Sequence, residues 1–520
     1  GGEGRGGEGR ARAARAQELG LVLACAAAIV VCYADRSNIA TAVRAMQARY
    51  GWDARAQGAV LSAFYWGYMA AQLPAAWLAR RLGGMPLLVA AVLAWSAFTM
   101  ATPLAADLGM GPLLACRVAL GLGEGVSFPA CHHLIARLVA APQQSKSVGA
   151  VTAASYAGVV LANYLTPLII AGAGWPAAFY AFGMAGFLWA AAAAYFYVAA
   201  GCWREPALGP RAAPLHRRLD VAADVAMQAL DVGTGVDTGV GTGVGVDAGA
   251  DADAGADLGA GGLGLEECGG PGPALDLALD DNGGADEGEG GGRGGDGGEG
   301  EGVPWAALLR APQVWAIVAN QFCQGWGFYV LLNWIPAYYE EELGVDVDGM
   351  GAYLVLPYLV QGAVGLSSGW LADALLARGM RPVACRRLFQ LPGMLLPAAF
   401  LLALAYLRVS PVAAMLLLTG SLGANALTIG GVSAYQLDFA PRHAAIVFSI
   451  GNATATLAGI VGVYATGVML LLPGAWFAVF WFAVALFVAG AVLWLLLARG
   501  HDGPLASLGG ALPAPPSRAA

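Results

Sequence analysis

The sequence predicts an all-α membrane protein with twelve transmembrane helices in two pseudo-symmetric six-helix bundles, joined by a long disordered loop. Apolar residues make up 58% of the 520 residues and charged residues only 12%, against about 45 to 50% and about 25% in soluble domains. Twelve stretches also supply the roughly 20 mainly apolar residues that a helix needs to cross a bilayer. A polar segment divides these stretches into six and six.

The predicted spans fix the domain organisation. We place them near residues 19–42, 57–79, 84–104, 111–138, 147–171, 175–199, 312–338, 349–375, 388–407, 411–437, 443–471 and 474–498. A basic tail rich in Gly, Ala and Arg (1–18) precedes the N-terminal bundle (19–199), and a tail (500–520) follows the C-terminal bundle (304–499).

The segment between the bundles, residues 200–303, differs from both in composition. Its residues 201–302 hold 20 of the 35 acidic residues but only 5 of the 27 basic ones, so the net charge of −8 describes this segment and not the membrane body. A chain dominated by Gly and acidic residues cannot bury enough apolar area to offset the entropy of ordering. We therefore expect a disordered linker here.

Basic residues in the short loops indicate the orientation in the membrane. Such residues concentrate on the cytoplasmic side. One set of loops carries Arg80, Arg81, Arg137, Lys146, Arg378, Arg381, Arg386, Arg387 and Arg442. The linker and both termini are therefore predicted to face the cytosol or the stroma-like side of an organelle.

Four ionisable residues deep inside predicted spans stand out: Asp35 and Arg36 in span 1, and Arg117 and Glu124 in span 4. An ionisable side chain deep in a bilayer costs at least about 2.5 to 3.5 kcal/mol, so each needs a reason to be there. Arg117 and Glu124 are seven residues apart, which places them on one helix face but about two turns from each other. We therefore expect their partners on another span.

The functional interpretation of these four residues is a central cavity that binds an anion. Arg36 and Arg117 would attract the anion, because guanidinium stays ionised and matches phosphate or carboxylate oxygens. Asp35 and Glu124 would take up and release protons or coordinate sodium. The alternative is a structural network of charges that holds two helices together.

Further candidates for the cavity wall are aromatic and amide side chains. Tyr68 closes the FYWGY stretch of span 2, and Asn452 lies in the SIGNAT stretch of span 11. In span 7, Trp326, Tyr329 and Asn333 repeat at three and four residues and share a face. Each of these residues has ordinary packing as its alternative.

Span 4 continues as GLGEGVSFPA, which places three glycines and a proline around Glu124. Gly121, Gly123 and Gly125 allow a close approach of another helix, as small residues do at membrane helix interfaces. Pro129 allows a bend.

The sequence does not contain the motifs of the common enzyme classes. We find no GxxxxGK[ST], GxSxG or HExxH motif, and the eight cysteines are not in a zinc-type spacing. We therefore expect a protein that is not an enzyme and has no cofactor, metal site or nucleic-acid partner. We expect a monomer in the lipid bilayer.

Several motifs in order resemble one branch of the major facilitator superfamily, the anion:cation symporters. YADRSNIA (33–40) resembles the DRxN element of this branch, and FYWGY resembles its FFWGY element. RVALGLGEGVSFPACHHL resembles the R-x-x-x-G-x-x-E-G-x-x-x-P-A signature, and WIPAYYEEELG and LPYLVQG follow in the second half. Within the branch, the chain looks similar to plant and algal plastid phosphate transporters and to vesicular glutamate and sialic-acid carriers.

The resemblance implies two bundles that rock about a central site. In this family the Arg that matches Arg36 binds the anion, and the acids that match Asp35 and Glu124 couple transport to protons or sodium. The resemblance carries substrate contacts over onto Arg117, Tyr68 and Asn452 as well. One departure is Leu61, which stands where vesicular glutamate carriers have a His in span 2 and argues against that substrate.

The sequence thus favours transport of inorganic phosphate, coupled to sodium or protons, across a chloroplast envelope or thylakoid membrane. A second hypothesis changes the cargo to an organic anion such as glutamate, ascorbate or a sugar acid. A third is a membrane sensor that binds an anion without transporting it.

Overall fold

The computed structural model describes residues 3–199, 201–203, 305–439 and 444–498, and these residues are almost entirely helical. The N-terminal half comprises α1 (Glu3–Tyr50), α2 (Ala54–Leu82), α3 (Gly84–Leu108), α4 (Met110–Glu124), α5 (Ser127–Leu138), α6 (Ala141–Ala173) and α7 (Trp175–Val198). The C-terminal half comprises α9 (Trp305–Arg310), α10 (Pro312–Glu341), α11 (Val347–Ala377), α12 (Pro382–Tyr406), α13 (Pro411–Asn425), η1 (Ala426–Ile429), α14 (Val432–Phe439), α15 (Ala444–Met469) and α16 (Ala475–Leu497).

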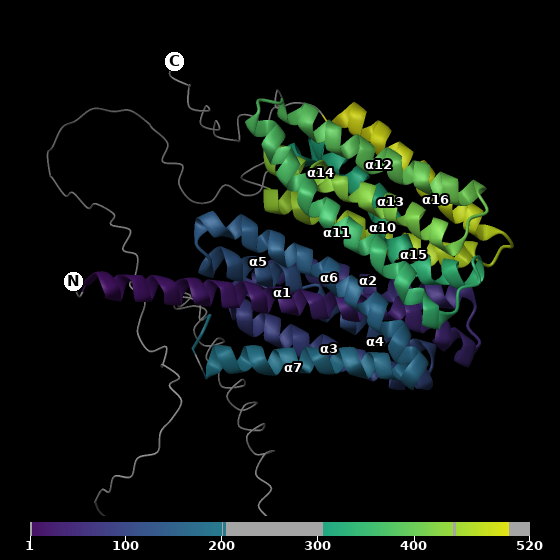
Figure 1. The fold of residues 1–520 in the computed structure, drawn as a ribbon, viewed down its shortest axis with the longest axis horizontal. Coiled ribbons are helices and arrows are strands. Elements are labelled where there is room, and N and C mark those ends of the chain that lie inside the picture. Colours follow the sequence, from purple (N-terminus) through teal and green to yellow (C-terminus); the bar gives the residue numbers. More distant parts are fainter. Residues whose placement is uncertain (1–2, 200, 204–304, 440–443, 499–520) are drawn as a thin grey trace, which may run out of the picture.

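The predicted fold is confirmed. The two halves form two groups of helices that pack along their length (Figure 1), with α2 against α15, α6 against α11 and α1 against α10 at the interface. Span 4 is α4 followed by α5, and span 10 is α13, η1 and α14 in succession, so each half supplies six spans. Apart from residues 201–203, the predicted disordered linker lies outside the described residues.

Ten helices in the described part of the chain are long and apolar enough to cross a membrane. The two remaining spans are α2 and α10, which have the length but carry more polar side chains. Both lie at the interface between the bundles, where α2 packs on α15 and α10 packs on α1. Amide and hydroxyl groups are tolerated there because they face protein and not lipid.

The two ends of the molecule differ in how the bundles meet. We call the end at which α7 finishes and α10 begins the linker end. At the opposite end, the Arg44 guanidinium of α1 is bonded to two carboxylates of α10, Glu340 at 2.6 Å and Glu341 at 2.7 Å. The side chain of Arg44 is only 8% exposed, whereas those of Glu340 and Glu341 are 37% and 35% exposed, so this clamp between the bundles is buried on its cationic side only.

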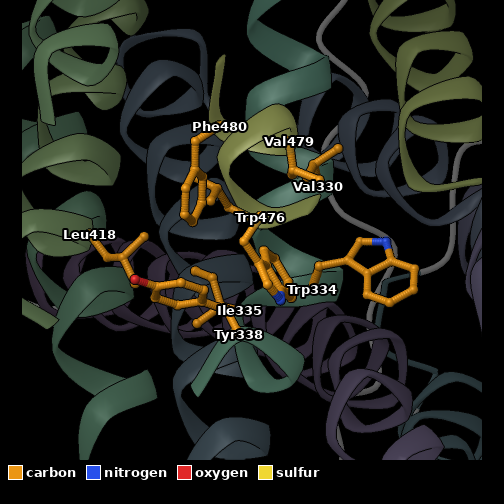
Figure 2. Close-up of a pocket in the computed structure, with 9 residues that line it drawn as sticks. Val330, Trp334, Ile335, Tyr338, Leu418, Trp476, Val479 and Phe480 are labelled. Atoms are coloured by element: carbon orange, nitrogen blue, oxygen red, sulfur yellow. The ribbon is translucent and has the colours of Figure 1, made fainter. Parts of the chain in front are cut away.

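The clamp is anchored from the C-terminal bundle. The indole nitrogen of Trp476 donates a hydrogen bond to Glu341 Oε2 at 3.2 Å. Figure 2 shows Trp476 among Trp334, Tyr338 and Phe480, which line a space of about 10 Å³. A space of that size holds about one water molecule. This apolar cluster therefore supports the clamp and is not a ligand site.

The clamp predicts that Arg44→Ala opens the end opposite the linker. Breaking this partly buried pair should cost about 1 to 3 kcal/mol, between the values for exposed and buried pairs, which multiplies the open population roughly five- to 150-fold. Spin labels at Leu108→Cys and Leu472→Cys, both exposed at this end on different bundles, report the separation. We expect a longer distance to appear in the Arg44→Ala variant.

The matched control is Arg49→Ala. Arg49 lies one turn further along α1 but pairs with Asp107 of α3 inside the same bundle, and both side chains are more than half exposed. Exposed pairs are worth about 0 to 1 kcal/mol. This variant should keep the wild-type distance distribution, and the same distribution in Arg44→Ala would contradict the clamp.

Candidate functional site

An ion pair between α1 and α4 lies at the centre of the N-terminal bundle. The Nη2 and Nε atoms of Arg36 donate to Glu124 Oε2 at 3.0 and 3.1 Å. The two side chains are 3% and 0% exposed. The partner of Glu124 thus comes from another span, as the spacing of Arg117 and Glu124 indicated. A buried charge needs such a partner, since removing one member of a pair costs about 3 to 5 kcal/mol.

Three aromatic rings surround the Arg36 guanidinium. Its carbon lies 4.4 Å from the ring centre of Tyr68, 4.5 Å from that of Tyr33 and 4.8 Å from that of Phe64. Ring faces attract cations, by about 2 kcal/mol or more when water is excluded. The rings therefore hold Arg36 in place while leaving its charge to be neutralised by an anion.

The close approach of α2 to α4 brings the rings of Phe64 and Tyr68 to the ion pair. A Cβ atom on Gly121 would lie 2.0 Å from the carbonyl oxygen of Phe64, and one on Gly67 would lie 1.9 Å from that of Val118. Only glycine fits at either position, so the two backbones touch one turn from Glu124. This is the close approach that the glycines of span 4 predicted.

The helix break between α4 and α5 places Glu124 at the end of a helix. Glu124 is the last residue of α4, and α5 starts at Ser127. Pro129 has no amide hydrogen for the carbonyl of Gly125, so regular helical bonding cannot continue there. At the same break, Ser127 Oγ donates to the carbonyl oxygen of Glu124 at 2.6 Å.

Asp35 and Arg117 are buried near this pair but are not joined to it. Both are 1% exposed. Among the described residues, neither carboxylate oxygen of Asp35 has a hydrogen-bond partner, and neither do Nε and Nη1 of Arg117. The Phe64 ring contacts the Arg117 guanidinium at 5.5 Å as well as that of Arg36. Water molecules or a rearrangement must satisfy these groups, because buried polar atoms are rarely left unpaired.

A cavity of about 210 Å³ opens between the two bundles beside this cluster. The N-terminal bundle contributes Tyr33, which also contacts Arg36, together with hydroxyl groups of α6. The C-terminal bundle contributes Tyr329 and a set of neutral hydrogen-bonding side chains, namely Gln321, Gln324, Gln361, Asn425 and Thr428. The cavity thus has a charged region behind one wall and neutral amides on the other.

Direct contacts join the bundles beside the cavity. Asn333 Nδ2 donates to the hydroxyl of Tyr65 at 2.8 Å, and the ring of Tyr65 lies 4.8 Å from that of Tyr329. Gln72 Nε2 donates to Thr456 Oγ1 at 3.3 Å. These contacts connect α2 with α10 and α15.

The structure brings together some of the candidate residues. Arg36, Glu124 and Tyr68 are in contact, and Tyr329 lines the cavity. Trp326 packs against Phe482 of α16, with ring centres 4.8 Å apart, and is not among the lining residues.

Asn452 is not a lining residue either; its carbonyl accepts a bond from Thr456. In span 7, the residues that helical spacing placed on one face have different surroundings: Tyr329 lines the cavity, whereas Trp326 packs in the interior of its bundle.

Sequence reasoning missed several side chains at the site. Cys32 was not singled out among the cysteines, yet its thiol contacts Glu124. Tyr156 and Gln361 line the cavity but were not singled out. The available signal was a polar side chain within an apolar span. That signal is weak for Tyr and Cys, which are also common in cores.

Two bundles of six spans, with a cavity of mixed polar and apolar lining between them, are the arrangement typical of membrane transporters. The sequence profile described as the Major Facilitator Superfamily matches residues 25–462. The chain therefore belongs to the Major Facilitator Superfamily and is a multi-pass membrane protein.

The relatives confirm the resemblance to the anion transporter branch. The chain is 29% identical to the chloroplastic sodium-dependent phosphate transport protein 1 of Arabidopsis thaliana, over 92% of this chain and 79% of that protein. It is 29% identical to the chloroplastic ascorbate transporter of the same plant, over 92% and 75%. It is 30% identical to human sialin, over 87% and 77%.

Solved structures share the fold at low sequence identity. A bacterial homologue of the human lysosomal transporter Spinster, in an inward-facing and occupied conformation, matches with a TM-score of 0.61 and 14% identity, over 92% of this chain and 96% of that one. The inward-open xylose transporter XylE from E. coli matches with a TM-score of 0.60 and 15% identity, over 94% and 99%.

The glycine contact predicts that Gly121→Ala disrupts the site. The added methyl would meet backbone atoms of α2, which cannot rotate away, so α2 must move off α4. Overpacking of this kind costs about 1 to 3 kcal/mol, and the melting temperature in detergent should fall by at least about 2 to 4 °C.

Gly111→Ala is the control, because Gly111 lies on the same helix with open space around it. It should leave the melting temperature unchanged or slightly raised, since alanine favours helix more than glycine does. Equal effects of the two substitutions would show that the contact does not constrain α2.

Proposed function

We propose that this protein is a proton-coupled secondary transporter of a small anion that works by alternating access. The buried ion pair between Arg36 and Glu124 carries the proposal. Arg36 is the anion-binding residue, and Glu124 is the proton-coupling residue. Asp35 and Arg117 extend the same charged cluster, and Tyr68 and Tyr329 complete the binding region.

Competition for Arg36 provides the coupling. In the present arrangement, the Glu124 carboxylate accepts the hydrogen bonds of the Arg36 guanidinium, as a bound anion would. A proton on Glu124 removes that negative charge and leaves Arg36 buried without a counter-charge, at a cost of about 3 to 5 kcal/mol. An anion from the cavity restores the balance, so proton and anion binding favour each other by on the order of a hundredfold or more.

The chemistry around Glu124 favours a proton over sodium as the coupling ion. The groups that bond to its Oε2 atom are N–H donors of Arg36 and the S–H donor of Cys32. Sodium is a hard cation, and hard cations take oxygen ligands that supply lone pairs. Donor hydrogens and a neighbouring guanidinium suit a site whose charge is switched by protonation.

Inorganic phosphate is the proposed cargo, because a guanidinium matches phosphate oxygens and a related chloroplast protein is named as a phosphate transporter. An organic anion is the second candidate. The cavity volume of about 210 Å³ and the amides on its far wall leave room for a hydroxylated body beyond the charged group. The relatives named for ascorbate and sialic acid fit this candidate.

Alternating access would proceed by rocking of the bundles about the cavity. The Arg44 clamp holds the bundles together at the end opposite the linker, and we propose that it breaks and re-forms in each cycle. The cavity lies within one chain, which supports action as a monomer. The chloroplastic relatives support a plastid membrane as the location.

Uptake into proteoliposomes tests the function and the cargo. Labelled phosphate and labelled ascorbate are offered in turn, with an imposed proton gradient or an imposed sodium gradient. We expect phosphate uptake that follows the proton gradient. Uptake of ascorbate alone would select the second candidate. Binding of an anion with no uptake under any gradient would overturn the transport proposal in favour of a sensor.

Substitutions in the ion pair separate binding from coupling. Glu124→Gln should reduce gradient-driven uptake by about a hundredfold. Counterflow exchange should persist, because a neutral amide leaves Arg36 free for the anion. Arg36→Ala should abolish both. Equal loss of both activities in Glu124→Gln would make Glu124 a structural residue. Arg81→Ala serves as the control for general loss of charge. Arg81 lies in the last turn of α2, and its guanidinium stacks on the ring of Trp77.

A further inference from the structure

We propose that Cys32 is a positioning residue that holds the Glu124 carboxyl through the transport cycle. The Cys32 thiol donates to Glu124 Oε2 at 3.3 Å in a buried contact. The same oxygen accepts both bonds from Arg36. The other oxygen, Oε1, is buried and has no partner among the described residues. The inference rests on the proton-coupled function proposed above.

The geometry of α1 makes Cys32 and Arg36 act on the carboxylate together. They are four residues apart, so they lie one above the other on the same helix face. Ser127 Oγ, at the start of α5, lies 3.9 Å from Cys32 Sγ and bonds to the Glu124 backbone. The thiol therefore sits between the carboxylate and the helix break that positions it.

The unequal bonding of the two oxygens assigns them different roles. Oε2 is held by three donors, whereas Oε1 has a free lone pair to accept a proton. Protonation at Oε1 removes the charge without requiring any bond at Oε2 to break first. Arg36 can then turn to the anion while the thiol keeps the neutral carboxyl in place, so Glu124 can recapture Arg36 when the proton leaves.

A second buried cysteine of α1, Cys25, allows the role of Cys32 to be compared with simple core packing. Cys25 lies two turns earlier on α1 and, like Cys32, is almost completely buried. The contacts described for Glu124 include Cys32 and not Cys25. A role confined to core packing would give the two cysteines similar behaviour on substitution.

The pH profile of driven uptake tests the role. Cys32→Ala removes a donor that stabilises the charged carboxylate, so Glu124 should protonate at lower proton concentration. We expect the midpoint of the profile to move up by about half a pH unit to one unit. Cys32→Ser restores a donor and should reverse more than half of this shift, and Cys25→Ala should keep the wild-type midpoint. An unmoved midpoint in Cys32→Ala overturns the inference.

Infrared difference spectroscopy gives a readout that does not depend on transport. The S–H stretching band is separate from other protein bands and shifts when the thiol loses or gains an acceptor. The band that disappears in Cys32→Ser should shift between high and low pH in the wild-type protein and should not shift with pH in Glu124→Gln. A band whose position does not change with pH in the wild-type protein would contradict the contact between Cys32 and Glu124. Failure of uptake with a pH-sensitive band would instead overturn the transport function alone.

Discussion

The organisation of this protein depends on one constraint: the buried guanidinium of Arg36 is destabilised by about 3 to 5 kcal/mol unless an anionic partner lies against it. Arg36 satisfies it with Glu124, at 3.0 Å and out of contact with water. The rings of Tyr33, Phe64 and Tyr68 stabilise the cation but carry no net charge, so they cannot replace that partner. An exposed pair would be screened by water and worth little. In the proposed mechanism, burial makes the loss of an anionic partner costly enough to couple proton binding to anion binding.

Features of the surrounding backbone serve this pair. The close approach of the backbones at Gly67 and Gly121 brings α2 against α4, which places the rings of Phe64 and Tyr68 over Arg36. The break at the end of α4 lets the Glu124 side chain meet α1 while its carbonyl bonds to Ser127. The Arg44 clamp closes the far end of the same helix α1. The clamp, the ion pair and the cavity wall thus each include a residue of α1, namely Arg44, Arg36 and Tyr33.

Much of this could be predicted from the sequence because membranes impose strong rules. Length and apolarity gave twelve spans, and the cost of charges in lipid singled out Asp35, Arg36, Arg117 and Glu124. Helical spacing excluded direct pairing of Arg117 with Glu124, which left α1 as the source of a partner. The sequence did not allow us to predict which side chains contact each other across different spans. The side chains of Trp326 and Tyr329 share a helix face by spacing, yet one packs on α16 and the other lines the cavity. Rotation of α10 about its axis decides between them, and no local pattern fixes that rotation.

The two bundles share an architecture with one interrupted span each but differ in charge. In the proposed mechanism, this difference gives them different roles. Span 4 breaks at Glu124 and span 10 breaks at η1, so each bundle has an interrupted helix beside the cavity. In the N-terminal bundle the break carries a carboxylate paired with Arg36. In the C-terminal bundle it carries Thr428, which accepts a bond from Gln324 at 2.7 Å. Neutral amides and hydroxyls change little in energy when a proton arrives, whereas the ion pair changes greatly. In the proposed mechanism, the N-terminal bundle would therefore respond to the ion gradient, and the C-terminal bundle would bind the uncharged part of the cargo.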